Sequence, residues 1–487
     1  MNTFLEPFVK KLQKCFNDGI KWIHPKTGEE IVSRIVVPLI IADAPARAEL
    51  QNVVNFNGRY GCNICEIKSR KCSVVAGKRR VRVYQYKEAK LRTKNRIKHQ
   101  VIKVMNSDKN HIKGIKENSS VAELPLIDVS SCFIPEYMHS VLLGVDRQFA
   151  SLWTEKKGPW KLKKELIIKI DSFLENIRPP YFFGRMPRKL TLFKHFKASE
   201  FYNWTLFYSL PALNGYLQLQ YLDHWMLLVK GLFILLKTTI TKEDMNEAEY
   251  LFSSFVEEIE TLYSDRELTY NSHQLRHLVL CVRRWGPLWG TAAFCFESFN
   301  GYIEIINHLT EVQALQLLKS KIIEKNSDPS VEVTSHQVIG KSIDKIILTG
   351  NDQQLLRNYG FEIKNLKIFA RAKILNEIYT SEIYKIIKTN SQTVQIEFKN
   401  STTVYGSIKL FFLTEDNLLY FILDKYIEDN GKYFVHSTKL VQVDHIIPFT
   451  KINSSLLINC NQIKNIFHVI VVGNYLCQRP NMLRKIF

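Results

Sequence analysis

The 487-residue sequence lacks an apolar run that is long enough to cross a membrane. Its most apolar stretch, residues 222–236, is interrupted by Asp223, His224 and Lys230. A transmembrane helix needs about 20 consecutive apolar residues, so this stretch predicts a buried helix and no membrane partner. Residues 1–20 carry charged side chains among the apolar ones and lack the pattern of a secretory signal, which favours a reducing compartment.

The chain contains only nine cysteines, an odd number. Only Cys62 and Cys65 have the spacing of a known motif, Cys-x-x-Cys. In a reducing compartment, a Cys-x-x-Cys pair predicts metal binding before a disulfide. The sequence also contains no internal repeat and no long low-complexity tract. These absences count against a disulfide-stabilised secreted scaffold and against a repeat array.

Acidic residues are outnumbered, with 47 Asp and Glu against 67 Lys and Arg, which gives a formal net charge of +20. Such an excess predicts a polyanionic partner, most often nucleic acid. A generally Lys-rich proteome would produce the same excess without that partner. Hydrophobic residues make up 46% of the chain, which predicts a folded protein with about two to four domains.

The basic residues concentrate between residues 68 and 116, where we expect residues 85–105 to form a helix with a basic face. The string KRRVR at residues 78–82 fits a nuclear-import signal or a strip of phosphate contacts. An ordinary solvated face is an equally simple interpretation. The candidate nucleic-acid contacts are Lys78, Arg79, Arg80, Arg82, Lys94 and Arg96.

Two acidic residues are candidate catalytic groups. Asp43 follows the apolar run Val32 to Ile41, which predicts a central strand buried on both faces, with the carboxylate just past its C-terminal end. Glu297 lies in an expected helix among Trp and Phe residues, which predicts a largely buried side chain. Together these carboxylates would hold Mg²⁺ or Mn²⁺ for attack on phosphodiesters. The simpler alternatives are a helix N-cap at Asp43 and a surface position at Glu297.

The cysteine pair has possible partners far downstream in the chain. His273 and His277 are separated by one helical turn, so both imidazoles lie on one face of a helix. Together with Cys62 and Cys65 they would complete a tetrahedral Cys₂His₂ zinc site. Taken separately, the cysteines also fit two buried thiols and the histidines an ordinary helix face.

The remaining pattern divides the chain into a helical part and a β-rich part. We expect helices at 4–16, 160–176, 203–237 and 242–263, the last with a Thr241-x-x-Asp244 capping box, and treat Asp128, Glu136, His139 and Asp146 as structural. A linker is expected at residues 326–330. The predicted strands are 393–398, 403–413, 418–425, 433–442 and 466–475.

Several strings resemble, in content and order, the transposases of the CACTA (En/Spm-like) group. Residues 4–9 (FLEPFV) and the Tyr221-x-x-His224 spacing share this resemblance, which covers at least residues 1–310. The main strings are IADAPARAEL, FNGRYGCNICEIK, EYMHSVLLGV, NSHQLRHLVLCVRRWGPLWG and FCFESFNGYI.

This resemblance implies an RNase H-like catalytic core, as in the catalytic subunit of the antigen-receptor recombinase. It matches Asp43 to the second catalytic acid and Glu297 to the third. The family often has Asp at the position of Glu136, and its first catalytic Asp lies upstream of this chain's start. Among residues 1–42 the only Asp is Asp18, in an Asn-Asp-Gly turn. The zinc ligands of the family match Cys62, Cys65, His273 and His277.

The expected fold class is α/β, with a partial RNase H-like core, a large α-helical insertion and a smaller β-rich C-terminal domain. The expected ancestral function is metal-dependent DNA cleavage and strand transfer at transposon ends. We expect this activity to be lost here, because the first catalytic Asp is missing. The alternative is a domesticated nuclear DNA-binding or scaffold protein without catalysis. The expected partners are DNA and other copies of the chain in a homo-oligomer. The expected boundaries are 1–100 and 278–325 for the core, 101–277 for the insertion and 330–487 for the C-terminal domain.

Overall fold

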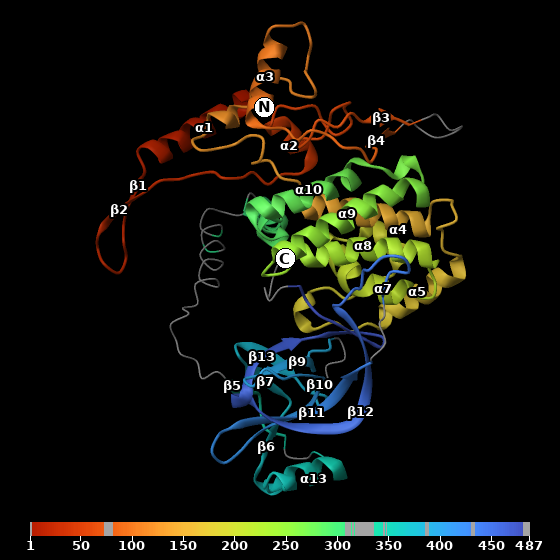
Figure 1. Cartoon of the computed structure of the whole chain (residues 1–487). Helices are drawn as coiled ribbons and strands as arrows, with labels where there is room; N and C mark the ends of the chain where they lie inside the picture. Colours follow the sequence, from red (N-terminus) through yellow and green to blue (C-terminus); the bar gives the residue numbers. More distant parts are fainter. Residues whose placement is uncertain are drawn as a thin grey trace.

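The protein is a mixed α/β chain with an N-terminal part, a helical middle and an antiparallel β-rich C-terminal part (Figure 1). Its structure is a computed structural model. The residues that it describes are 2–72, 81–306, 313, 316, 336–343, 346, 348–384, 389–429 and 434–480.

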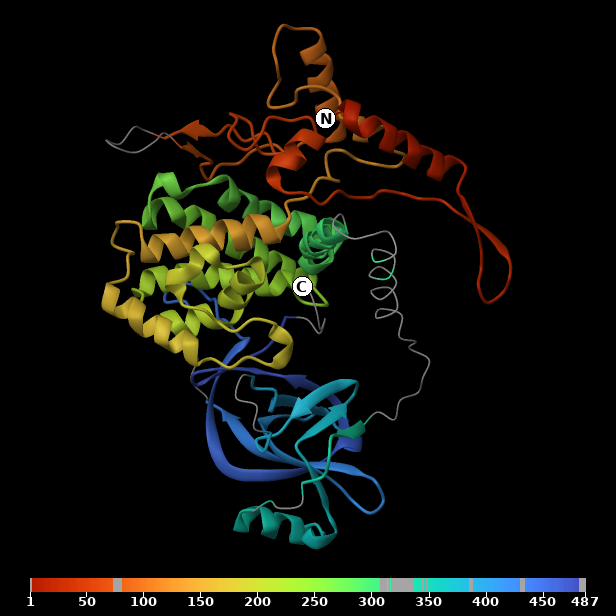
Figure 2. The ribbon, with the colours of Figure 1, turned by 180° about the vertical axis from the view of Figure 1, so that it is seen from behind.

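The N-terminal part contains short helices and two small hairpins, and its first hairpin extends away from the rest of the molecule (Figures 1 and 2). The expected helix at 4–16 is confirmed, whereas the basic helix expected from residue 85 begins only after the Thr93 cap. The elements are α1 (Asn2–Asn17), β1 (Ile20–Ile23), β2 (Glu30–Ser33), α2 (Ala44–Leu50), β3 (Arg70–Lys71), β4 (Arg82–Val83) and α3 (Lys94–Met105).

The prediction of a central buried strand from Val32 to Ile41 is wrong. Strand β2 ends at Ser33, pairs only with β1, and leaves Val32 about half exposed. Beyond it, Ile40 makes one isolated parallel bridge to Phe133. The β-branched composition favours extended backbone, but a buried strand also needs neighbours on both sides. Among the described residues up to 306, the sheets are two-stranded, so the RNase H-like core remains a proposal.

The helical middle is built around α8, whose residues 221–229 are all buried, so that the helix packs inside the bundle. It packs against α9, whose Thr241 and Asp244 form the expected capping box. The α-helices and π-helices of this part are the π-helix Met138–Asp146, α4 (Arg147–Thr154), α5 (Lys164–Asn176), α6 (Ala198–Asn203), the π-helix Trp204–Tyr208, α7 (Ser209–Leu213), α8 (Leu219–Leu235), α9 (Lys242–Leu262), α10 (Tyr270–Trp285) and α11 (Phe294–Ile306).

Short 3₁₀ turns connect these elements. They span Ser120–Glu123, Tyr181–Phe183, Leu190–His195, Asp265–Glu267, Leu288–Thr291, Ile363–Asn365 and Cys460–Gln462. No helix among the described residues has both the length and the apolar content that a membrane crossing requires.

The C-terminal part is a sheet in the order β13-β9-β10-β11-β12-β15-β14, with β6 also paired to β10 and a separate sheet β5-β7-β8. Strand β13 returns after a 3₁₀ turn to pair with β9, so the meander folds back on its own first strand. Its elements are β5 (His336–Ile339), α13 (Gly350–Asn358), β6 (Lys367–Phe369), β7 (Arg371–Ile374), β8 (Glu377–Thr380), β9 (Thr393–Phe398), β10 (Thr403–Leu413), β11 (Leu419–Glu428), β12 (Ile446–Asn459), β13 (Ile463–His468), β14 (Ile470–Val472) and β15 (Tyr475–Cys477).

The predictions for this part are confirmed at 393–398 and 403–413 and are close at 418–425. The strand expected at 433–442 is wrong over its described residues, because Phe434 and Val441 turn into the core of the helical middle. The single run expected at 466–475 is divided among β13, β14 and β15. The linker expected at 326–330 lies outside the described residues.

The helical middle and the β-rich part share one buried core. His445 is buried there: its Nε2 donates to the carbonyl oxygen of Leu206 at 2.9 Å, and its ring stacks on Phe233 with the ring centroids 3.8 Å apart. The apolar side chains that the C-terminal part adds to the helical core are Phe434, Val441, Val443, Ile446, Ile470, Val472 and Cys477.

Candidate functional site

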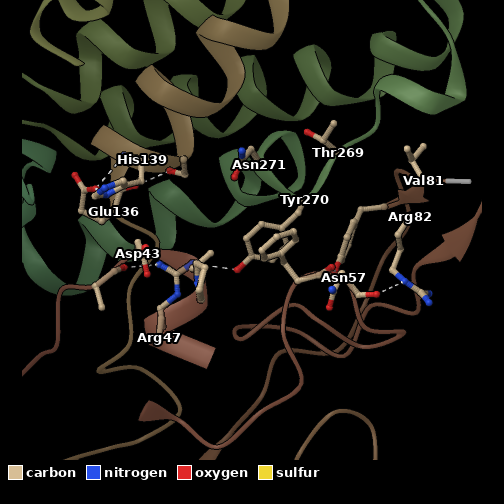
Figure 3. A pocket seen from close by; sticks show the side chains of 16 residues that line it. Asp43, Arg47, Asn57, Val81, Arg82, Glu136, His139, Thr269, Tyr270 and Asn271 are labelled. Carbon is tan, nitrogen blue, oxygen red and sulfur yellow. Dashed lines mark hydrogen bonds and ion pairs between the residues drawn. The ribbon is translucent and has the colours of Figure 1, made fainter. Parts of the chain in front are cut away.

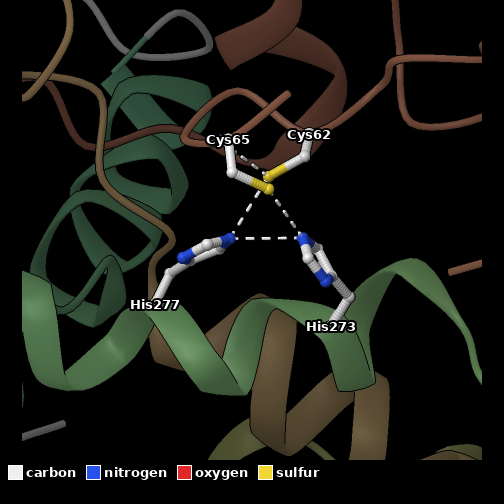
Figure 4. A group of neighbouring side chains, drawn as sticks. All are labelled: Cys62, Cys65, His273 and His277. Carbon is white, nitrogen blue, oxygen red and sulfur yellow. Dashed lines mark hydrogen bonds between the residues drawn. The ribbon is translucent and has the colours of Figure 1, made fainter. Parts of the chain in front are cut away.

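The four predicted metal ligands come together from two segments that are far apart in the chain. Cys62 and Cys65 lie in the loop between α2 and β3, where the Cys65 backbone N–H points at Cys62 Sγ over 3.4 Å. His273 and His277 lie one turn apart on α10, which begins after the N-cap Thr269. All four side chains are buried and converge, as Figure 4 shows.

The spacing of the four ligand atoms fits a tetrahedral metal ion. His273 Nε2 lies 3.3 Å from Cys65 Sγ, His277 Nε2 lies 3.5 Å from Cys62 Sγ, and the two Nε2 atoms are 3.2 Å apart. Zinc bonds of about 2.3 Å to sulfur and 2.0 Å to nitrogen place N and S ligands roughly 3.5 Å apart and two N ligands roughly 3.3 Å apart. The cluster therefore has the donor set and the dimensions of a Cys₂His₂ site.

The surroundings favour the thiolate of Cys62 and the neutral imidazole of His273, which are the forms that bind metal, whereas the hydrogen bond with Cys62 and burial raise the pKa of Cys65. Burial opposes ionisation of Cys62, but the Cys65 thiol and the two histidines outweigh it and hold the pKa of Cys62 well below its usual range. Burial lowers the pKa of His273. The Gln274 amide donates to Cys62 Sγ at 3.4 Å, and this contact holds the sulfur in place.

A cavity of about 510 Å³ lies beside this cluster and is lined by residues of the N-terminal part, the π-helix Met138–Asp146 and α10. Asp43 lies at one end of it (Figure 3). Its Oδ1 accepts the Ala46 N–H at 2.9 Å, so Asp43 is the N-cap of α2, the simpler of the two roles that its sequence allowed. Its side chain still faces the cavity.

Glu136 and His139 lie at the same end as Asp43 (Figure 3). Glu136 is fully buried and accepts four hydrogen bonds, from the N–H groups of Met138, His139 and Ala293 and from His139 Nδ1. The hydrogen bond that His139 donates to Glu136 raises the pKa of His139, and the charges of Glu136, Glu297 and Asp43 add to the effect. Because Ala293 precedes α11, Glu136 fixes the start of the helix that carries Glu297. Sequence spacing alone did not reveal this role.

Glu297 approaches the same cluster but is not buried. Its Oε1 lies 3.7 Å from His139 Nε2, and its side chain is 54% exposed. The expectation of a largely buried Glu297 is therefore wrong, because the neighbouring residues on α11, such as Phe296, also face outward. The structure thus brings Asp43 and Glu297 to the same histidine.

Asp43 and Glu297 are not part of a group with metal-ligand spacing among the described residues. Asp43 is engaged as a helix cap and Glu297 is paired with His139. Among the described residues, the group with metal-ligand spacing is the Cys62, Cys65, His273 and His277 cluster.

The predicted nucleic-acid contacts have different environments. Arg82 lines the cavity and donates from Nε to the Asn57 carbonyl at 2.6 Å. Lys94 is exposed at the start of α3, whereas Arg96 forms an ion pair with Glu66 at 3.3 Å. The other three, Lys78, Arg79 and Arg80, lie outside the described residues.

Comparison of the chain with models of protein families and with curated proteins gives no match.

Proposed function

We propose that this chain is a transposase-derived DNA-binding protein of the nucleus that keeps a structural zinc ion and has lost DNA cleavage. The observation that carries the proposal is the Cys/His cluster, which joins the segment after Asp43 to the helix that precedes Glu297. Such a clamp explains how two residues far apart in the sequence reach one cavity. The same order of motifs is what makes the sequence resemble CACTA transposases.

Zinc is the ion that suits this cluster best. Two thiolates and two imidazoles offer borderline-soft ligands, and Mg²⁺ prefers oxygen. All four ligand atoms lie within 4.8 Å of one another. Four protein ligands complete the tetrahedral coordination of zinc and leave no coordination position for water or a substrate. A closed site of this kind supplies folding free energy.

The environment of the two acids supports the proposed loss of cleavage. Phosphodiester hydrolysis by two metal ions needs carboxylates that are free to coordinate. Asp43 holds the N-terminus of α2, and Glu297 lies on an exposed helix beside His139. Neither contributes to a cluster with metal-ligand spacing among the described residues.

DNA binding is supported by charge. The chain carries a net charge of +20, and helix α3 exposes basic side chains on a segment that projects from the N-terminal part (Figure 1). Lysines on such a surface contact phosphates without reading sequence, which makes the affinity fall steeply with salt. The exposed lysines of α3 are Lys94, Lys98 and Lys103.

The decisive experiment measures DNA binding and nicking on the same purified, zinc-loaded chain. Affinity for a labelled duplex should fall by about tenfold or more between 50 and 200 mM salt. Supercoiled plasmid with Mg²⁺ or Mn²⁺ should remain intact in the wild type, in Asp43→Asn and in a Glu49→Gln control. Nicking that needs the metal and disappears only in Asp43→Asn would show an active nuclease. Absence of duplex binding at 50 mM salt would rule out the DNA-binding proposal.

A further inference from the structure

The cavity beside the metal cluster contains a buried charge whose counter-ion is missing from the described residues. Arg47 is only 2% exposed, yet its guanidinium forms no ion pair with a described carboxylate. Its Nη1 donates to the carbonyls of Ala42 and Ile134 at 3.3 and 2.7 Å, and its Nη2 donates to the Tyr270 hydroxyl at 3.0 Å. Its buried Nε has no partner.

A buried, unpaired guanidinium is costly, so its presence needs a reason. Neither of the two carboxylates in the cavity wall forms an ion pair with Arg47. Asp43 caps α2, and Glu136 uses both oxygens on four N–H donors. An anionic ligand would supply the missing charge, and guanidinium matches phosphate well.

The other end of the cavity is aromatic. Figure 3 shows the acids, His139 and Arg47 toward one end, Asn57, Val81 and Arg82 toward the other, and Tyr270 between them. The rings that line the aromatic end are Phe56, Tyr84 and Tyr270.

These rings form one continuous wall. Phe56 and Tyr84 lie 5.7 and 5.5 Å from Tyr270, measured between ring centroids. The Phe56 side chain is 40% exposed, which leaves a ring face open for stacking. Exposed aromatic faces beside arginines are the usual means by which proteins hold unpaired bases.

We propose that this cavity binds one unpaired nucleotide of a DNA strand, with its phosphate at Arg47 and its base stacked on Phe56. The inference rests on the proposed DNA-binding function and names the form of DNA that the cavity takes. A volume of about 510 Å³ suits a single nucleotide unit. A base inside a duplex cannot reach such a pocket unless it leaves the stack.

The test compares a fluorescent ten-nucleotide dT strand with a duplex of the same length by anisotropy. Wild-type protein should bind the single strand about tenfold more tightly than the duplex. Phe56→Ala, at an exposed position, should lose about tenfold on the single strand and nothing on the duplex. Tyr359→Ala removes an exposed ring of the C-terminal part and is the matched control.

Arg47 is tested by its effect on stability, because its loss can disturb folding. Inorganic phosphate and dTMP should raise the melting temperature of the wild type, dTMP more than phosphate. Arg47→Met should keep its zinc and abolish both increases, and Arg47→Lys should retain part of them. A merely structural arginine would lower the melting temperature and leave the ligand-induced increases intact.

Two results would overturn the inference. Equal affinity for single strand and duplex, unchanged by Phe56→Ala, would remove the nucleotide pocket while leaving DNA binding in place. An equal increase in melting temperature with dTMP in the wild type and in Arg47→Met would show that Arg47 does not bind the nucleotide. Failure to bind either DNA at low salt would instead remove the proposed function and this inference together.

Discussion

The Nε2 atoms of His273 and His277 lie 3.2 Å apart, inside a pocket closed by two cysteine sulfurs. Two imidazole nitrogens at this distance must share either a proton or a cation. A shared proton would satisfy the two rings but would not account for the position of the Cys62 and Cys65 sulfur atoms beside them. A metal ion satisfies all four ligands at once.

Removing one ligand should therefore release the metal and loosen the fold. Cys62→Ser and His277→Ala should each lower the zinc content of the purified protein from about one ion per chain toward zero. The free energy of unfolding should fall by roughly 3 kcal/mol or more, because metal binding contributes to folding directly. Mass spectrometry under native conditions and thermal unfolding with and without a chelator measure both effects.

The matched control is Cys72→Ser, which changes a buried cysteine outside the cluster. It should leave the zinc content unchanged. An unchanged metal content in Cys62→Ser and His277→Ala would contradict the zinc assignment.

Glu136 and Glu297 should respond differently to the same substitution. Glu136→Gln places an amide NH₂ against N–H donors in a buried site, which should cost about 3 kcal/mol. Glu297→Gln changes an exposed side chain and should shift the unfolding free energy by less than about 0.5 kcal/mol. Urea titrations of both variants test this. Equal costs would show that Glu297 is more tightly held than its exposure indicates.

Two buried histidines should make the protein sensitive to acid. Burial lowers the pKa of His224 and of His445 to about 3, below the value near 6.5 that each has when unfolded. Since the unfolded chain takes up the protons first, stability is full above pH 6.5 and declines as the pH falls from there toward 3. Each histidine contributes a slope of about 1.4 kcal/mol per pH unit within this window.

His445→Phe removes the contribution of His445 to the pH dependence of the free energy of unfolding. The phenyl ring can keep the stack on Phe233 but gives up the contact with the Leu206 carbonyl, at a cost of about 1 kcal/mol at neutral pH. Its stability should then fall less steeply with acid than that of the wild type. Parallel pH curves for the two proteins would refute the prediction.

The pair formed by Lys409 and Asp352 should stabilise the attachment of α13 to the sheet. Lys409 Nζ lies 2.7 Å from both carboxylate oxygens of Asp352, whose side chain is only 3% exposed. Lys409→Met would leave a buried charge unpaired, at a cost of about 3 kcal/mol. Lys364→Met removes the exposed pair with Glu362 and should cost less than about 1 kcal/mol. Chemical denaturation of the two variants compares the pairs.

The sequence predicts local features well where the signal lies in neighbouring residues. The capping box at Thr241 and Asp244 and the strands at 393–398 and 403–413 are of this kind. Metal-ligand spacing is also local within each half of the cluster, so the approach of Cys62 to His277 could be inferred by joining two motifs.

Features that depend on distant partners were harder to predict. The run at Val32 indicates extended backbone but not whether other strands flank it. Glu136 acquires its role from Ala293, which no spacing rule connects to it. Strand β12 was missed because Lys451, Ser454 and Ser455 interrupt its apolar pattern where the strand is exposed.

The sharing of one core by the helical middle and the late segments has a consequence for biosynthesis. Helix α8 is covered by the segment around Ser437 and His445, and the π-helix Trp204–Tyr208 by β14 and Cys477. Those residues leave the ribosome long after the helices do. Part of the apolar surface of the helical middle is therefore exposed to solvent until translation reaches the C-terminal part. A chain truncated before residue 434 would keep all four metal ligands but would expose apolar surface to chaperones and proteases.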